Sequence, residues 1–285
     1  MSCYVGLVKI HKYSEVDVFS PLPYQGNPLA VVHDADDLST EQMQRFAKWT
    51  NLAETTFLLE PTSPLADYRV RIFSATQEFP FAGHPTLGTA FAWLDRGGVA
   101  RNEHEVIQEC GAGLISVRTE NQSLAFKAPP LTRYEPVAEP LVRTIAAALG
   151  ITRNQIIDAS WLINGPEWIG VKLSNAQEVL ALRPDPAGLD TLCLGVIGEH
   201  PEGHDARFEV RAFVGGDPVW EDPVTGSLNA GLARWIFDST NIDRNYIAAQ
   251  GTAIGYNGRV HLFAEGNDIW VGGNVTSCVR GEVRL

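Results

Sequence analysis

Short apolar runs with strand or helix spacing, separated by glycine and proline, make up most of the chain. Residues 68–73 alternate apolar and polar side chains, which predicts a half-buried strand. Apolar side chains at helical spacing between residues 87 and 94 predict a helix that ends in a left-handed cap at Gly97-Gly98. Ser39 and Gln42 form a capping-box pattern, which predicts a second helix ending near Asn51. Further strands are predicted at residues 15–19, 29–32, 105–108, 113–118, 124–126, 169–171, 191–197, 259–263, 268–271 and 280–284.

The helix near residue 87 follows an extended apolar approach that ends in Gly83-His84-Pro85. Proline fits the first helical position, because its φ angle is preset and no hydrogen bond is lost there. This places His84 at the N-cap, beside unpaired backbone N–H groups and the positive end of the helix dipole. We therefore expect this helix start to attract an anion.

The same construction occurs a second time in the chain. Residues 70–73 lead to His84 and a helix, and residues 210–213 lead to Asp222 and another predicted helix. His84 and Asp222 are 138 residues apart, and each precedes a proline and then a glycine with a hydroxyl residue. We interpret the pattern as a duplicated domain, in which a pseudo-twofold axis would aim two helix starts into one shared cleft.

Glu54 stands between the helix that ends near Asn51 and a strongly β-prone run. A carboxylate that enters a buried strand is costly unless it is paired, protonated or facing a cleft. The residue 138 positions later is Leu192, so the duplication has kept no second carboxylate there. Glu54 is therefore a candidate for a single acid/base group.

A length of 285 residues corresponds to about two domains. The pair Pro129-Pro130 is the candidate boundary. We predict an N-terminal half at residues 1–129 and a C-terminal half at residues 130–285, and the last strand is allowed to cross back to the first half.

Charge and residue spacing exclude several classes of partner. The formal net charge of −12 argues against nucleic acid and anionic membranes. The four cysteines show no metal-ligand spacing, and the histidines other than His84 also lack it, so no metal site is expected. The N-terminal residues do not have the pattern of a signal peptide, and no apolar segment reaches the length of a membrane helix, so a cytoplasmic location is expected.

Taken together, five sequence blocks resemble the PhzF family, the phenazine biosynthesis-like proteins, which share the diaminopimelate epimerase fold. The blocks stand in the family's order and cover nearly the whole chain. They are residues 16–19, 26–32, 51–57, 81–88 and 221–227.

The resemblance implies a two-domain α/β (α+β) fold. Each pseudo-symmetric domain would be a strongly curved mixed sheet wrapped around a central helix, with an active site between the domains. It also implies a homodimer and no metal or organic cofactor.

The resemblance assigns catalytic roles to three residues. The carboxylate of the Asn-Leu-Ala-Glu block, here Glu54, corresponds to the family's proton-shuttling group. His84 and Asp222 correspond to its other polar active-site groups. From the residues alone, His84 is also explained as a capping or core histidine, and Asp222 as an ordinary N-cap. For Asp222 the two roles are compatible, since one oxygen can cap while the other faces a cleft.

Four further residues are assigned to substrate binding in the same way. Gly83, Gly226 and Ser227 would offer backbone N–H groups to a substrate carboxylate, and Ser227 a hydroxyl as well. Asn27, in the Gly-Asn-Pro block, is assigned to the same set. The expected ligand is thus a small anionic metabolite.

The chain departs from the true epimerases, which have a cysteine at each of the two helix starts. His84 and Asp222 occupy those places here, so racemisation with two thiols is not expected. Residues 228–230, Leu-Asn-Ala, also differ from the phenazine enzyme's pattern, which leaves the substrate open.

We expect a cofactor-independent isomerase that moves a proton within a small carboxylate-bearing metabolite. Two alternatives stay open at this point. One is a racemase or epimerase with His84 and Asp222 as opposing bases. The other is a non-catalytic metabolite-binding or interaction protein on the same scaffold.

Overall fold

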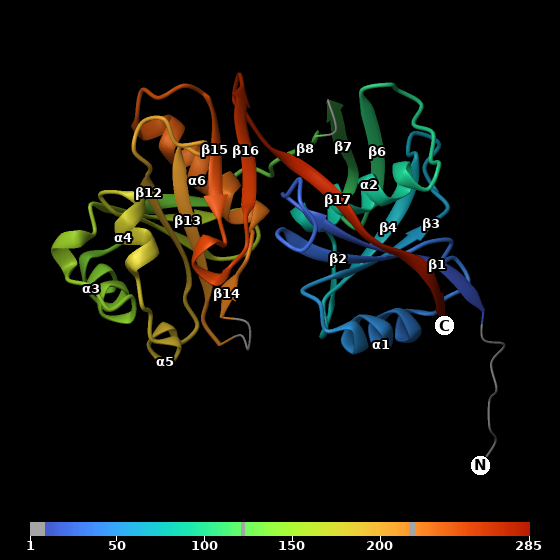
Figure 1. Cartoon of the computed structure of the whole chain (residues 1–285), viewed down its shortest axis with the longest axis horizontal. Helices are drawn as coiled ribbons and strands as arrows, with labels where there is room; N and C mark the ends of the chain where they lie inside the picture. Colours follow the sequence, from blue (N-terminus) through green and yellow to red (C-terminus); the bar gives the residue numbers. More distant parts are fainter. Residues whose placement is uncertain (1–8, 121–122, 217–219) are drawn as a thin grey trace, which may run out of the picture. The chain divides into compact units, whose positions relative to one another are not determined.

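The computed structural model describes residues 9–120, 123–216 and 220–285, which divide into two compact units (Figure 1). Unit 1 takes in the described residues up to Phe126 together with Asn274–Leu285, and unit 2 is Lys127–Gly273. The sequence analysis placed the boundary at residue 129. None of the described helices is long and apolar enough to cross a membrane.

Unit 1 is a mixed sheet with two helices. In chain order its elements are β1 (Ile10–Val18), β2 (Asn27–Val32), α1 (Thr40–Thr50), β3 (Thr55–Leu59), β4 (Tyr68–Phe73), β5 (Glu78–Phe79), α2 (Gly83–Asp95), β6 (Glu105–Cys110), β7 (Gly113–Glu120) and β8 (Ser123–Lys127). Strand β2 pairs in parallel with β3, and β4 with β6. The other pairs along the sheet, β1–β2, β3–β4, β4–β5, β6–β7 and β7–β8, are antiparallel.

Unit 2 repeats this order after a short N-terminal addition. The addition is β9 (Arg133–Pro136), α3 (Glu139–Ala148) and η1 (Arg153–Gln155). The repeated elements are β10 (Asp158–Ile163), β11 (Trp168–Lys172), α4 (Ala176–Ala181), α5 (Pro186–Leu189), β12 (Cys193–Glu199), β13 (Phe208–Val214), β14 (Glu221–Asp222), α6 (Gly226–Ser239), β15 (Asn245–Gln250), η2 (Thr252–Ile254), β16 (Gly258–Glu265) and β17 (Asp268–Arg284). Strand β17 continues into unit 1, where it pairs with β1.

The strand pairings show that the chain is a duplication. As in unit 1, the second and third strands of the repeat pair in parallel, β11 with β12, and so do β13 and β15. The pairs β10–β11, β12–β13, β13–β14, β15–β16 and β16–β17 are antiparallel, as are their counterparts in unit 1. Each unit therefore has two parallel strand pairs, at corresponding places in its sheet.

A repeated ion pair follows the same correspondence. Arg71 on β4 donates from Nε and Nη2 to Glu78 at 2.7 and 2.6 Å, and Arg211 on β13 donates to Glu221 at 2.9 and 2.8 Å. In unit 1 the two side chains are 27 and 38% exposed, whereas in unit 2 they are 4 and 5% exposed. Loss of either partner in unit 2 would leave a buried charge uncompensated, which is far more costly than the loss of a surface pair.

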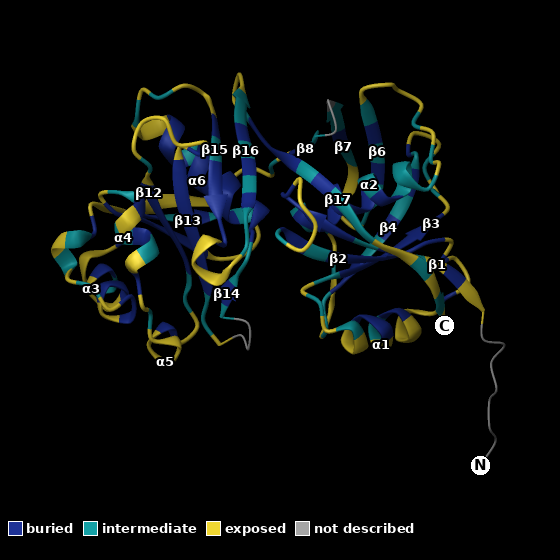
Figure 2. Ribbon diagram, viewed as in Figure 1, coloured by how far each residue is buried: buried dark blue, intermediate teal, exposed yellow. Residues whose placement is uncertain are grey.

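Helices α2 and α6 are the central helices of their units. Helix α2 packs on β1, β2 and β3, and α6 packs on β10, β11 and β16. Leu87 of α2 and Leu228 and Leu232 of α6 are fully buried. Figure 2 shows α6 in the buried colour, while α1 and α3 show exposed faces. Truncation of such a buried leucine to alanine typically costs about 2–5 kcal/mol.

The predicted N-caps of both central helices are wrong. Helix α2 begins at Gly83 after the N-cap Ala82, so His84 is its second residue. Pro85 is tolerated further in, because the first N–H groups of a helix have no acceptor within the helix. Helix α6 begins after the N-cap Thr225, and Asp222 ends strand β14 instead.

The predicted end of α2 and start of α1 are confirmed. Gly97 has a φ of 94°, and its N–H donates to the Leu94 carbonyl at 3.0 Å. The Gly98 N–H donates to the Trp93 carbonyl at 2.9 Å, which completes a Schellman cap. At α1, Ser39 and Gln42 form both bonds of the capping box.

Gly26 is held in a close backbone approach just before β2. A Cβ on Gly26 would lie 2.4 Å from the Val18 carbonyl oxygen, and its N–H bonds the Asp17 carboxylate at 3.3 Å. The Gly-Asn-Pro block thus needs glycine at its first position for steric reasons.

We predict that Gly26→Ala lowers the free energy of unfolding by about 1–3 kcal/mol, because the main chain must move to admit the methyl group. Gly281→Ala is the matched control, since a Cβ there meets no atom within 4 Å. Urea unfolding of both variants is the measurement, and equal stabilities would contradict the assignment.

Candidate functional site

Glu54 and His84 meet at the start of the central helix of unit 1. Glu54 directly precedes β3, and His84 is the second residue of α2. The His84 Nε2 and Glu54 Oε2 atoms lie 3.3 Å apart, with side chains 9 and 18% exposed. The Thr89 hydroxyl of α2 donates to the Thr56 hydroxyl of β3 at 2.9 Å, so the elements that carry the two residues are tied together.

Burial sets the charge state of His84. Desolvation lowers the pKa of His84 to about 3, so its imidazole is neutral at pH 7. Its place in the first turn of α2 acts in the same direction, because the positive end of a helix dipole disfavours imidazolium. The contact with Glu54 is therefore one between a neutral imidazole and a carboxyl group.

Gly83 is the first residue of α2, and Asn27 is the first residue of β2. A Cβ on Gly83 would approach the Phe126 ring to 2.6 Å, so only glycine fits there without movement. The Gly83 and His84 N–H groups precede the first bond of the helix, from the Thr86 N–H to the Ala82 carbonyl. Asn27 is buried at the start of β2, the parallel neighbour of the strand that follows Glu54.

In unit 2, Asp222 is bound by the residue that caps α6. The Thr225 hydroxyl donates to Asp222 Oδ2 at 2.7 Å. Asp222 is thus a carboxylate held in front of a helix start rather than its cap. The fully buried Gln250 contacts both Asp222 and Thr225.

Ser227 is held in place by two side chains from the β10–β11 hairpin. The Trp168 Nε1–H donates to Ser227 Oγ at 3.0 Å, and Asn164 Nδ2 donates to the Ser227 carbonyl at 2.9 Å. Because Oγ accepts from the buried indole, its own proton remains available as a donor toward a ligand. Ser227 follows Gly226, the first residue of α6.

At the helix starts, the two halves are offset by a different number of residues from the 138 that the sequence predicted. Gly83 and Gly226, which begin α2 and α6, are 143 residues apart, and so are His84 and Ser227. Asp222, the last residue of β14, corresponds instead to Phe79, the last residue of β5. The predicted equivalence of His84 and Asp222 is therefore wrong, and the two units present different chemistry at their helix starts.

The predicted residues thus fall into two groups. Unit 1 contains Asn27, Glu54, Gly83 and His84, and unit 2 contains Asp222, Gly226 and Ser227. That both groups serve one substrate stays a prediction.

The sequence predicted no role for Trp168, Asn164, Thr225 or Gln250. For Asn164 a signal was present, because Asn164-Gly165-Pro166 echoes the Gly-Asn-Pro block of the first half. Gln250 has an analogue in Gln108, two positions away in strand register, and each lies on the strand that pairs in parallel beside the helix start. That correspondence becomes visible only once the strands are paired.

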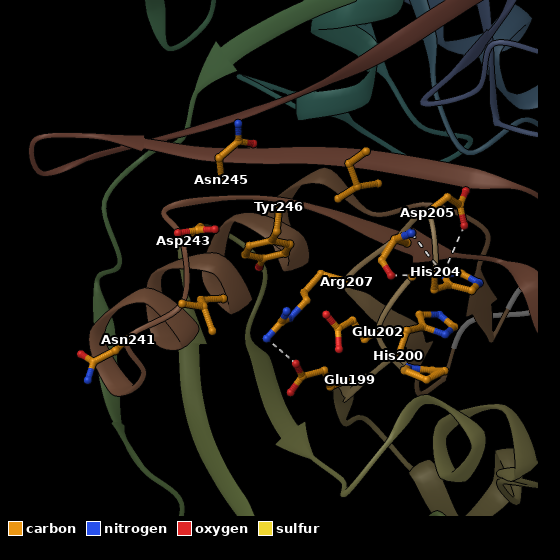
Figure 3. Close-up of a pocket in the computed structure, with 15 residues that line it drawn as sticks. Glu199, His200, Glu202, His204, Asp205, Arg207, Asn241, Asp243, Asn245 and Tyr246 are labelled. Carbon is orange, nitrogen blue, oxygen red and sulfur yellow. Dashed lines mark hydrogen bonds and ion pairs between the residues drawn. The ribbon is translucent and has the colours of Figure 1, made fainter.

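A separate cavity of about 700 Å³ lies in unit 2 beside residues 199–207 and 241–247 (Figure 3). His200 bonds the buried Glu209 at 3.0 Å and stacks on His204 with ring centroids 3.6 Å apart. These contacts stabilise the turn between β12 and β13, and none of the predicted site residues lines the cavity. In the described part of the chain, no group of three or more His, Cys, Asp or Glu residues is placed to hold a metal ion.

Comparisons with known proteins agree over nearly the whole chain. The family model described as phenazine biosynthesis-like protein (PhzC-PhzF) matches residues 16–279. The antisense-enhancing sequence 1 protein of Schizosaccharomyces pombe is 36% identical, over 95% of this chain and 98% of its own length. The trans-2,3-dihydro-3-hydroxyanthranilate isomerase of Pseudomonas chlororaphis is 34% identical, over 97% and 100%.

Solved structures share the fold. A phenazine biosynthesis protein of the PhzF family from Enterococcus faecalis matches with a TM-score of 0.82 at 25% identity, over 97% of this chain and all of that one. A hydroxyproline epimerase from Agrobacterium vitis matches with a TM-score of 0.57 at 12% identity, over 97% and 93%. The second likeness concerns the fold alone, and together they place the chain in the expected epimerase-like architecture.

We predict that His84 makes the protein less stable at acid pH. An unfolded histidine takes up a proton below a pKa of about 6.5, whereas the folded His84, with a pKa of about 3, does not. Stability is therefore lost as the pH falls from 6.5 toward 3, and the contribution of His84 to this loss is about 2 kcal/mol at pH 5.

The measurement is the change in unfolding free energy between pH 7.5 and pH 5. His84→Gln should show a smaller acid loss than the wild type, while His104→Gln, at an exposed position, should keep the wild-type loss. Identical pH dependences for wild type and His84→Gln would show that His84 is not held neutral.

Proposed function

We propose that this chain, which belongs to the phenazine biosynthesis-like (PhzC-PhzF) family and is an isomerase of that family, moves a proton within a small carboxylate-bearing metabolite. The observation that carries the proposal is the half-buried Glu54 carboxyl group, 3.3 Å from a neutral imidazole at a helix start. A carboxylate in such a setting suits the removal of a proton from carbon and its return.

The proposed reaction has two proton transfers. Glu54 takes a proton from a carbon next to an unsaturated or carbonyl system, and the electron pair of the broken C–H bond spreads into that system. Glu54 then gives the proton to another carbon of the same substrate, the double bond changes position, and the carboxylate is restored. His84 would be the hydrogen-bond partner of Glu54, as acceptor or as donor, while the Glu54 carboxyl group gains and loses the proton.

The proposed substrate contacts are the backbone amides and polar side chains at the helix starts. Gly83, Gly226 and Ser227 would donate to a substrate carboxylate, with Asn27 as a further contact. The relatives named for trans-2,3-dihydro-3-hydroxyanthranilate make that compound the first to test. We propose that the reaction needs no cofactor, and that the protein is a cytoplasmic homodimer.

The geometry favours this reaction over epimerisation by His84 and Asp222. A neutral imidazole that takes a proton from carbon becomes a cation, and the burial of His84 opposes that imidazolium form. Glu54 becomes neutral on accepting a proton, which burial favours. A non-catalytic binding protein is the weaker alternative, because the relatives include isomerases that match at full length.

We predict that Glu54→Gln lowers turnover at least about 100-fold, because the amide cannot carry the proton, while fold and ligand binding are kept. The assay incubates the protein in heavy water with trans-2,3-dihydro-3-hydroxyanthranilate, and then with a metabolite extract, and follows deuterium gain by mass spectrometry. Glu60→Gln, an exposed site in the same unit, is the matched control and should act as wild type. Wild-type turnover in Glu54→Gln would reject the assignment.

A further inference from the structure

We propose that Gln250 and Thr225 are positioning residues that direct a hydroxyl proton onto Asp222 Oδ2 and so hold Asp222 as a carboxylate in front of α6. The inference rests on the proposed function only in that the family resemblance assigns Asp222 to the active site. The hydrogen bonds themselves do not depend on that role, and they can be tested without a substrate.

The orientation of the Gln250 amide is determined by two backbone groups. Its Oε1 accepts from the Thr225 N–H at 3.0 Å, and its Nε2 donates to the Asp222 carbonyl at 3.0 Å. If the amide were flipped, its NH₂ group would face the Thr225 N–H and its oxygen would face the Asp222 carbonyl, so neither hydrogen bond could form. Gln250 is fully buried, so no solvent could repair either mismatch.

Asn229 completes the acceptor side of this network. Its Nδ2 donates to Gln250 Oε1 at 2.7 Å and to the Thr225 carbonyl at 2.9 Å. The Gln250 oxygen therefore accepts two bonds, and its nitrogen has two protons to place. One N–H of Gln250 Nε2 donates to the Asp222 carbonyl, so the other N–H donates to Thr225 Oγ1 at 2.9 Å.

The direction of the Thr225 hydroxyl follows from that bond. A hydroxyl has one proton, and Thr225 Oγ1 already accepts from Gln250, so its own proton is directed to Asp222 Oδ2 at 2.7 Å. Oδ2 is then an acceptor, which favours the carboxylate form.

Unit 1 has a comparable buried glutamine, Gln108, without this device. Gln108 Nε2 donates to the Thr86 hydroxyl at 2.9 Å, and Tyr68 donates to Gln108 Oε1 at 3.0 Å. The Thr86 hydroxyl in turn donates to the Ala82 carbonyl at 2.9 Å. A buried glutamine on the parallel strand thus supports both helix starts, and only in unit 2 does its chain of bonds end on a carboxylate.

The test is a titration of Asp222 by NMR, with aspartate labelled at the side-chain carboxyl carbon. Thr225→Val removes the donor with little change of shape and should move the midpoint of the Asp222 titration about one pH unit higher. Thr225→Ser keeps the hydroxyl and should restore the wild-type midpoint. Thr86→Val, the matched change in unit 1, should leave the Asp222 titration unchanged.

An unchanged Asp222 midpoint in folded Thr225→Val would overturn the proposal. If that variant does not fold, neutron diffraction from deuterium-exchanged wild-type crystals decides the matter. A Thr225 deuterium on the line to Asp222 Oδ2 supports the inference, and one that points to Gln250 refutes it. The titration uses no substrate, so its failure is distinct from failure of the Glu54→Gln assay, which tests the proposed function.

Discussion

The structure depends on one constraint: each unit buries the start of its central helix inside a sheet. A helix start presents N–H groups that its own ladder cannot satisfy, and burial makes them costly unless other groups bind them. Unit 2 solves this with Gln250, which accepts from the Thr225 N–H, and unit 1 supports its helix start through Gln108 and Thr86. The remaining N–H groups of these helix starts are the ones suited to hold an anion.

The duplication supplied two helix starts, and the copies then diverged. The corresponding arginine–glutamate pairs are exposed in unit 1 and buried in unit 2. A carboxylate directly precedes β3, whereas Leu192 precedes β12. The second helical residue is a neutral histidine in unit 1 and a serine in unit 2. One scaffold thus carries a carboxyl–imidazole pair in one half and hydroxyl donors with a carboxylate in the other.

Local patterns in the sequence predicted the parts of the fold that local forces decide. The capping box at Ser39 and the glycine cap at Gly97 were correct, because each depends on residues within one helical turn. The N-caps of the central helices were wrong, since proline is tolerated at several positions of a first turn and does not mark one of them. The register of 138 failed at the helix starts because the connections between elements differ in length, so the two helices are offset by 143 residues.

At the candidate site too, the sequence predicted what short motifs encode and missed what depends on the folded structure. Glu54 and His84 were singled out from short motifs, and the structure brings them within 3.3 Å. Gln250 could not be found in that way, because its partners lie more than twenty residues before it and are brought close only by the parallel pairing of β13 and β15. Its identity as a positioning residue comes from the amide orientation, which is a property of three dimensions.

The central claim is that one carboxyl group, Glu54, both removes and returns the hydrogen. The most direct measurement uses a substrate deuterated at the carbon that loses hydrogen and follows the label at low conversion in ordinary water. The account predicts that part of the deuterium reappears at the carbon that gains hydrogen, because the same group carries it between the two. Product that contains only solvent hydrogen at that carbon, from the first turnovers onward, would contradict it.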